Sequence, residues 1–411
     1  GRSKQDDRDS YINKRIDLPG MIIEEIFKQY FKKMMNECTK FFGRRNQDVE
    51  SPLNIINQIK PNIIEQGLKA TLLTGEWGKK KGVAQMLQRF TYLYAMSSLR
   101  RVNSPTVNAS VNKLTSPRHL HGTQVGFICY IETPEGQKVG LVKNLALMGQ
   151  ITVMLSSNTY LLKGYLHDKL LDLADLHPSK FGTLVKVFLN GEWLGMTEKP
   201  AYLYENLRNL RDKGYFDRTV SFVFDTKTRE LQLYTDGGRP IRPILRVKNN
   251  SLQLTRAMVN DISSETNPSS SKVQTWEGFM AKYPGVIDYL DIEENYHSMI
   301  AMDEGKVQEM SRKELQIVPY EDTKIKPVLN RYGDNVFVRY THCEIHPAML
   351  LGIVSANIPS LNHNQGPRNV YQFSQARQAM GIYTTSYRHR LDLSYGLYKP
   401  HRPLVTTLMM K

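Results

Sequence analysis

The chain has 411 residues, 40% of them hydrophobic and 23% charged, which is typical of a globular protein with two to four domains. Lys and Arg outnumber Asp and Glu by 55 to 40, and the net charge of +15 indicates a polyanionic partner or a basic part of a larger complex. Three cysteines without a CxxC pair argue against a disulfide framework and a structural zinc site. The charged N-terminus and the short apolar runs argue against a signal peptide and a membrane span, so we expect a soluble, intracellular protein.

Three amphipathic helices are predicted near the start of the chain, from apolar residues at helical spacing. They are expected over residues 22–35, 63–73 and 83–100. The apolar stripe of the first helix is interpreted as a core-packing face. Gly75 is expected to stop the second helix, and the polar stretch 103–116 to form an exposed loop after the third.

From Gln124 onward the pattern changes to short β-rich pieces, expected at 125–131, 140–142 and 150–155. Residues 157–250 are expected to form a separate α/β unit. Its helices are predicted near 170–176 and over 201–213, and its strands over 183–189, 220–224, 230–234 and 243–247, with a tight turn at Asn190-Gly191. The Ser-rich stretch 262–275 is predicted to be a linker or surface loop, and a smaller unit follows to about residue 340. The fold class is therefore α+β and multidomain.

Residues 117–145 are unusual for a simple core or surface, because charged side chains crowd around several glycines. These charged or titratable residues are Arg118, His119, His121, Glu132, Glu135, Lys138 and Lys143. Glu132 and Glu135 flank Thr133-Pro134, as an acid–base pair or as turn carboxylates that orient Arg or Lys. We favour the second interpretation.

Residues 341–347 (THCEIHP) contain potential metal ligands, and in a strand His342, Glu344 and His346 would share one face. Pro347 follows at once, no second cluster accompanies them, and the HExxH spacing is absent. We therefore expect no metal site here.

Within residues 363–381 a helix is predicted to begin beside Gln365 and Gly366, with Pro367 at the first helical position and Gly381 as the C-terminal stop. Its N-terminus, beside Gln365, would present free N–H groups, and Arg368 adds a fork of donors, so a phosphate is the predicted ligand.

Arg377 lies nine residues after Arg368, about half a turn away in angle, so the two cannot grip one phosphate from one face. A joint role needs an extended ligand such as a nucleic-acid strand, and Arg377 alone would be an ordinary helix-surface arginine. Basic residues interleaved with tyrosines over 383–402 are compatible with binding of a single strand or a hybrid, although tyrosines also fill cores.

Five segments resemble, in order and spacing, the second-largest subunits of multisubunit DNA-directed RNA polymerases of the eukaryotic, archaeal or large-DNA-virus type. They are DDRDSYINKRIDLPG (6–20), SSLRRVNSP (97–105), SPRHLHGTQVGFICYIETPEGQKVGLVKNLALM (116–148), THCEIHPAMLLGIVSANIPSLNHNQGPRNVYQFSQARQAMG (341–381) and YKPHRPLVTT (398–407). The resemblance covers essentially the whole chain, more loosely over 157–340. It implies a central third of the full subunit, and both abrupt chain ends fit an internal piece.

The resemblance implies a domain layout. It is the end of a helical lobe/protrusion portion over 1–82, the fork over 83–152, two mixed α/β external domains over 157–250 and 251–345, and the start of a β-rich hybrid-binding domain over 346–411.

The resemblance also implies nucleotidyl transfer from ribonucleoside triphosphates, with Mg²⁺ held mainly by the largest subunit. The implied partners are that subunit, smaller subunits, template DNA and the RNA–DNA hybrid, and the isolated piece would be inactive. The implied site residues are Arg368 for the nucleotide triphosphate, Arg377, Gln378, Arg118 and Lys113 for nucleic acid, and Glu135 and Gln365 for support of the active centre.

Two departures from the family pattern indicate a divergent lineage, for which we favour a large DNA virus over a cellular polymerase. The first fork loop is short, because Lys79–Lys81 lead almost directly into the next predicted helix, and Val125 stands where the family has Trp. The location would be the host cytoplasm or virion if viral, and the nucleus if cellular and eukaryotic. Two alternatives remain: a nucleic-acid-binding module without catalytic partners, and a piece that only packs against other subunits.

Overall fold

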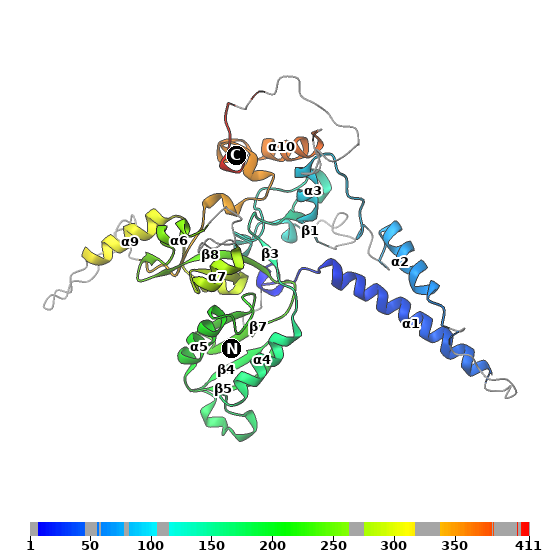
Figure 1. Cartoon of the computed structure of the whole chain (residues 1–411), viewed down its shortest axis with the longest axis horizontal. Helices are drawn as coiled ribbons and strands as arrows, with labels where there is room; N and C mark the ends of the chain where they lie inside the picture. The colour runs from blue at the N-terminus through cyan, green and yellow to red at the C-terminus, as the bar shows by residue number, and fades with distance from the viewer. Residues whose placement is uncertain are drawn as a thin grey trace, which may run out of the picture.

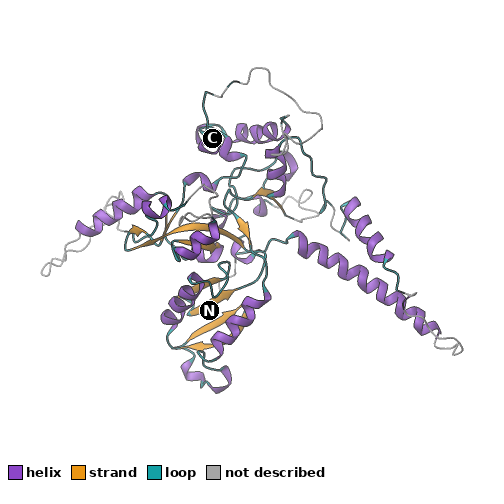
Figure 2. Ribbon diagram, in the orientation of Figure 1, coloured by secondary structure: helices purple, strands orange, loops and turns teal. Residues whose placement is uncertain are grey.

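A computed structural model describes residues 7–45, 56, 59–77, 82–104, 115–262, 275–316, 338–379, 381, 401 and 404–410. Three sheets with flanking helices form the body of the molecule, and a pair of helices projects from it (Figures 1 and 2). This is the α+β architecture expected from the sequence. None of the helices in these ranges is both long and apolar enough to cross a membrane.

The projecting pair consists of α1 (Pro19–Arg45) and α2 (Asn62–Thr74), which pack against each other (Figure 1). Gly67 of α2 lies against the ring of Tyr30, where a Cβ would collide, so the helices approach closely. Gly75 ends α2 in the left-handed conformation, at φ 69°, as the sequence predicts.

The apolar stripe of α1 is only partly buried. Ile26 and Met34 are buried, whereas Met21, Ile23, Phe27, Phe31 and Met35 are 43–50% exposed. The interpretation of the whole stripe as a core face is therefore wrong within the described residues, because α2 covers only one side of α1.

The third helix is shorter than predicted, since α3 covers only Tyr92–Leu99. Thr91 caps it by accepting a hydrogen bond from the Tyr94 N–H at 3.0 Å. Residues 82–91 are not helical, and the Val83 N–H donates instead to the Gly75 carbonyl at 3.0 Å. A helical apolar pattern was thus overridden by a local cap and a tertiary hydrogen bond.

A two-stranded antiparallel sheet, β1 (Arg101–Asn103) and β2 (Val142–Asn144), follows α3. β1 was not predicted, and β2 lies two residues beyond its predicted start. In the predicted strand 125–131 only Ile128 forms a β-bridge, to Leu145.

The four-stranded sheet has the order β5-β4-β7-β6, with β4 and β7 parallel and the other pairs antiparallel. Its strands are β4 (Val185–Leu189), β5 (Glu192–Thr197), β6 (Ser221–Asp225) and β7 (Glu230–Tyr234), and its helices are α4 (Ser156–His167) and α5 (Pro200–Asp212). Apolar side chains from α4, α5 and these strands form one buried core. Asn190-Gly191 makes the predicted tight turn, with positive φ at both residues.

The predictions for this part are confirmed for α5 and for strands β4, β6 and β7, whereas α4 and β5 were missed. The short helix predicted near 170–176 is a 3₁₀ turn over Leu173–Asp175.

The six-stranded sheet is built around β8 (Pro240–Lys248), which contains the predicted strand 243–247. Its neighbours are β3 (Gln150–Ile151), β9 (Ser251–Leu252), β10 (Ile287–Asp291) and β12 (His342–Cys343), and β11 (Ile300–Ala301) pairs in parallel with β12. The helices along this part are α6 (Arg256–Asn260), α7 (Trp276–Lys282), α8 (Ile292–Tyr296) and α9 (Glu304–Gln316). A second apolar core lies between the sheet, α7 and α9.

After β12 the described residues form helices and no strand, although the resemblance implied the start of a β-rich domain there. The main element is α10 (Gly366–Gln378), which contacts α3 (Figure 1). The helix ends at Gln378 rather than at Gly381, because Ala379 turns to an extended conformation. The predicted Ser-rich linker and the basic, Tyr-rich stretch 383–402 lie almost entirely outside the described residues.

Candidate nucleotide and nucleic-acid interface

The start of α10 presents an exposed arginine. Gln365 takes the N-cap position with an extended backbone, Pro367 occupies the first turn, and no side chain caps the helix. Arg368 is exposed, and its guanidinium lies 5.7 Å from the centre of the Tyr371 ring. Pro367 has no N–H and the Arg368 N–H donates to the Gln365 carbonyl at 3.0 Å, so a phosphate at this helix end would be held mainly by the forked Arg368 cation and the positive end of the helix dipole.

Asn369 ties this first turn to the preceding segment. Its side chain is buried, donates to the Leu361 carbonyl at 3.1 Å and accepts from the Asn364 amide at 3.2 Å. The two asparagines of the HNQGPRN motif therefore hold the loop that leads into the helix.

Arg377 is buried near the other end of α10. It forms an ion pair with Glu132, and its Nε donates to the Ser97 hydroxyl at 3.3 Å. It is thus not the ordinary surface arginine that the sequence allowed. Arg368 is exposed and Arg377 is buried, so the two lie on different faces, as the spacing predicted.

Glu132 is the internal partner of this arginine and is only 2% exposed. One carboxylate oxygen receives Arg377 and the Ser97 hydroxyl, and the other receives the Ser355 hydroxyl at 3.4 Å. Burial raises the pKa of Glu132, and the charge of Arg377 opposes that shift. Glu132 therefore orients an arginine, which is the interpretation we favoured over an acid–base pair.

Hydrogen bonds within and directly after the ETPEG turn (residues 132–136) hold this segment in place. Arg118 donates from one nitrogen to the carbonyls of Gln137 and Val139, at 2.7 and 2.9 Å. Thr133 accepts from the Gly140 N–H at 2.9 Å. Glu135 is exposed. The structure thus brings Arg118 to the segment that directly follows the ETPEG turn.

The other predicted site residues are more dispersed. Gln378, the last residue of α10, and Gln365 are both exposed. Lys113 lies outside the described residues. The nucleic-acid roles of Arg118, Lys113, Arg377 and Gln378 stay predictions.

Lys143 is a buried cation that the sequence analysis named only as one of several charges. It is 7% exposed and donates to the Gly140 carbonyl at 2.6 Å. Burial, with the nearby charge of Lys14, lowers the pKa of Lys143 to about 8. Its place between apolar residues in GLVKNL was the only sequence signal for this burial.

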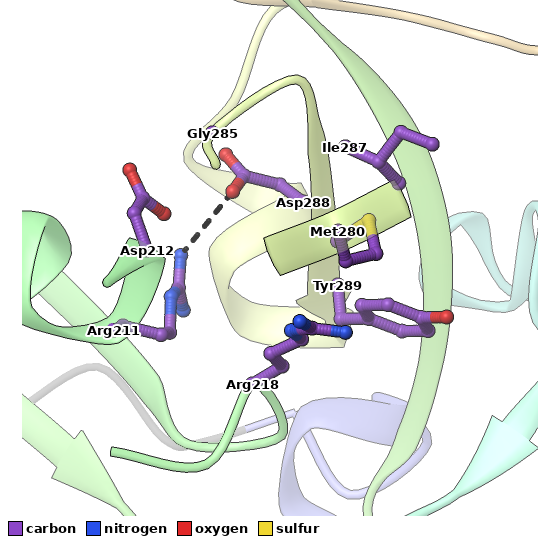
Figure 3. Close-up of a pocket in the computed structure, with 8 residues that line it drawn as sticks. All are labelled: Arg211, Asp212, Arg218, Met280, Gly285, Ile287, Asp288 and Tyr289. Atoms are coloured by element: carbon purple, nitrogen blue, oxygen red, sulfur yellow. Dashed lines mark ion pairs between the residues drawn. The ribbon is translucent and has the colours of Figure 1, made fainter. Parts of the chain in front are cut away.

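A cluster of largely buried charges joins α5, which packs on the four-stranded sheet, to the six-stranded sheet, and sequence reasoning missed it. Asp288 of β10 receives Arg208 and Arg246 at 2.9 and 2.5 Å, and Arg211 pairs with Glu294 at 2.8 Å. Figure 3 shows Arg211 and Asp288 facing each other beside a cavity of about 10 Å³. Such a space holds about one water molecule, so the cluster is structural.

The potential metal ligands of residues 341–347 do not converge on one point, because each side chain binds a different partner. His342 lies 3.2 Å from Asp288, Glu344 pairs with Arg242 at 2.6 Å, and His346 caps the turn that follows. Across the described ranges no group of three or more His, Cys, Asp or Glu side chains could hold a metal ion. These residues do not fit a Mg²⁺ site.

Comparison with known proteins identifies four successive domains of one family. Models described as "RNA polymerase Rpb2" match residues 85–151 (domain 3), 187–248 (domain 4), 276–347 (domain 5) and 354–411 (domain 6).

Relatives match along the whole chain. The chain is 47% identical to DNA-directed RNA polymerase subunit 2 of Acanthamoeba polyphaga mimivirus, over 99% of its length. It is 39% identical to DNA-directed RNA polymerase II subunit 2 of Arabidopsis thaliana and 31% to subunit Rpo2 of Sulfolobus acidocaldarius, each over 100% of its length. The chain spans about a third of the length of these relatives (33%, 33% and 34%). It therefore belongs to the family of Rpb2-type second subunits of multisubunit DNA-directed RNA polymerases.

Proposed function

We propose that this chain is part of a DNA-directed RNA polymerase, a nucleotidyltransferase that copies DNA into RNA from ribonucleoside triphosphates. Within that enzyme it supplies contacts to the nucleotide and to nucleic acid beside the active centre. The observation that carries this proposal is the exposed Arg368 in the first turn of α10, held by the HNQGPRN motif. Membership of the Rpb2 family supports RNA synthesis as the reaction of the whole enzyme.

In this proposal Arg368 binds and orients the triphosphate of the incoming nucleotide. Its guanidinium offers several donors in one plane, and the start of the helix adds partial positive charge from the helix dipole. Gln365 and Glu135, both exposed, support the active centre from two loops. Mg²⁺, when it is bound by the largest subunit, would supply charge neutralisation.

The proposed partners are the largest subunit, smaller subunits, template DNA and the RNA–DNA hybrid, and the chain alone is inactive. Arg118, Lys113 and Gln378 are proposed to act at the nucleic-acid side. Arg377 was expected there too, but because it is paired with Glu132, any role it has beside nucleic acid is proposed to be indirect, through the helix that it holds. The net charge of +15 supports a polyanionic partner. The location is the host cytoplasm or virion for a viral enzyme and the nucleus for a eukaryotic one.

The proposed layout has the end of the lobe/protrusion portion over 1–82, the fork over 83–152, external domains over 157–250 and 251–345, and the start of the hybrid-binding domain over 346–411. The order of the four family matches supports it. β8 lies in the first proposed external domain by sequence, yet it pairs with β10 and β12 of the second. The two external domains would thus share one sheet.

The test is single-nucleotide addition on an RNA–DNA scaffold by the assembled polymerase, wild type against Arg368→Ala. Loss of a charged hydrogen bond costs roughly 1.5–3 kcal/mol. We expect kcat/KM for the nucleotide to fall by about 10- to 150-fold, mainly through a higher KM. Arg368→Lys, which keeps the charge but loses the fork, should lie between the two.

Arg256→Ala is a matched control, because Arg256 is an exposed arginine in the first turn of α6. It should leave nucleotide addition unchanged. Wild-type kinetics in Arg368→Ala would remove Arg368 from the site.

A second candidate function is a nucleic-acid-binding module without catalytic partners, which the charge of +15 favours. Such a module would bind a hybrid with an affinity that falls linearly with salt on logarithmic scales, because phosphate contacts release counterions. Failure of the subunit to assemble with a largest subunit, together with such binding, would favour this alternative.

A further inference from the structure

Helix α10 is attached to the molecule along a narrow stripe. Its buried side chains are Asn369, Phe373 and Arg377, which are four residues apart and share one face. Two of the three are polar, so directional contacts determine how the helix is seated. Asn369 holds the first turn to its own preceding loop, and Arg377 holds the last turn to the ETPEG turn.

The contact of Arg377 joins segments that are far apart in the sequence. Its partner Glu132 lies 245 residues earlier. Ser97 of α3 and Ser355 donate hydrogen bonds to the same carboxylate. The carboxylate therefore connects α3, the ETPEG turn, the segment at Ser355 and α10.

The space around this carboxylate leaves little room for change. A Cβ on Gly352 would collide with one oxygen of Glu132, so the chain approaches closely there. Glu132 is 2% and Arg377 9% exposed, so both charges are largely removed from water. Removing one partner would leave the other charge buried without a counter-charge.

We propose that Glu132 and Arg377 are positioning residues, which seat α10 on the ETPEG turn and thereby set the location of Arg368. This inference rests on the proposed role of Arg368. The two arginines are nine residues apart, about 13.5 Å along a rigid helix, so a shift at one end moves the other. A misplacement of about 1 Å can cost up to about 100-fold in rate.

The competing role for Arg377 is a direct contact with nucleic-acid phosphates. Its guanidinium instead binds Glu132 and Ser97, and its side chain is 11% exposed. In our proposal Glu132 and Arg377 work as one unit, whereas in a direct contact only Arg377 would matter.

The test compares Glu132→Gln, Arg377→Met and the double variant in the assembled polymerase. We expect each single variant to lower kcat/KM for the nucleotide by at least about tenfold, because a shifted α10 would displace Arg368. The double variant removes both charges with little change of shape, so it should recover part of the loss. The proposal would be overturned in favour of a phosphate contact by two results together. The double variant would have the same kcat/KM as Arg377→Met, and the slope of log scaffold affinity against log salt concentration would be smaller by about one.

Hydrogen exchange of the α10 amides supplies a readout that does not depend on activity. Glu132→Gln should speed exchange in α10, whereas Glu294→Gln should not. Glu294 is a matched control, because it is an equally buried glutamate paired with Arg211 at 2.8 Å in another part of the molecule.

Failure of this inference can be told from failure of the proposed function. Normal α10 exchange and normal kinetics in Glu132→Gln, beside a defect in Arg368→Ala, would overturn the positioning role alone. Faster α10 exchange in Glu132→Gln, with normal nucleotide kinetics in both variants, would overturn the nucleotide role of Arg368.

Discussion

The four-stranded sheet and helix α10 differ in what holds each of them in place. The sheet and its helices bury a continuous set of apolar side chains, most of them contributed within about 75 residues of chain. Helix α10 buries only Asn369, Phe373 and Arg377, and its decisive contact comes from Glu132. Apolar contacts are non-directional and tolerate adjustment, whereas a charged hydrogen bond defines an orientation. The helix that carries the proposed nucleotide contact is therefore oriented by polar contacts rather than by extensive apolar packing.

The substitution with the largest expected effect tests whether the strands of the six-stranded sheet also depend on buried charges. Asp288→Asn removes the carboxylate that receives Arg208, Arg246 and Arg211. Breaking a buried pair from one side costs about 3–5 kcal/mol. Hydrogen exchange of the β8 and β10 amides in the assembled polymerase should report an opening free energy lower by that amount. No change would mean that apolar packing alone holds these strands, which would sharpen the comparison.

The same residue predicts a pH dependence. Burial alone would raise the pKa of Asp288, but the hydrogen bond from His342 and the charges of Arg211 and Arg246 hold it well below 3.8. A lowered folded-state pKa adds stability that is present above the unfolded value and is lost as the pH falls below about 3.8. The difference in protection between wild type and Asp288→Asn should therefore narrow in that acid range. A constant difference would contradict the assigned shift.

A further prediction tests the apolar core with neighbouring residues of one helix. Leu162 of α4 is fully buried in the core of the four-stranded sheet, whereas Leu161 is 54% exposed. Leu162→Ala should lower the local opening free energy by about 2–5 kcal/mol. Leu161→Ala should stay within about 0.5 kcal/mol of wild type. Hydrogen exchange of the β4 and β7 amides measures both, and equal effects would show that the core does not carry the stability.

The substitution with the smallest expected effect is in the N-cap of α3, the helix that α10 contacts. Thr91→Ala removes the hydroxyl that caps α3 and should cost α3 about 1 kcal/mol. Thr74→Ala is the control, because the Thr74 hydroxyl makes its hydrogen bonds at the end of its own helix, donating to carbonyls of α2 and accepting from the Glu76 N–H. Hydrogen exchange of the amides of Tyr92–Leu99 measures this loss. The KM for the nucleotide should also rise slightly if α3 helps to position α10. An unchanged exchange rate in Thr91→Ala would show that tertiary contacts alone define this helix.

Much of the candidate site followed from the sequence. Pro367 and the residues after it predicted α10, and Arg368 is exposed at its start as expected. The internal role of Arg377 could not be predicted, because its partner lies 245 residues away and no local pattern connects them. The charges around Asp288 were missed for the same reason, since they come from α5, β8 and β10.

The sequence by itself determined the family and the elements whose patterns are local. The ETPEG and HNQGPRN motifs identify the Rpb2 family, and β7 has the predicted bounds Glu230–Tyr234 because alternating side chains define such a strand. Only the tertiary structure decided which segments meet. It paired β8 with strands from both sides in sequence and buried Arg377 against Glu132. These outcomes depend on contacts between distant segments, whose free energies exceed local preference.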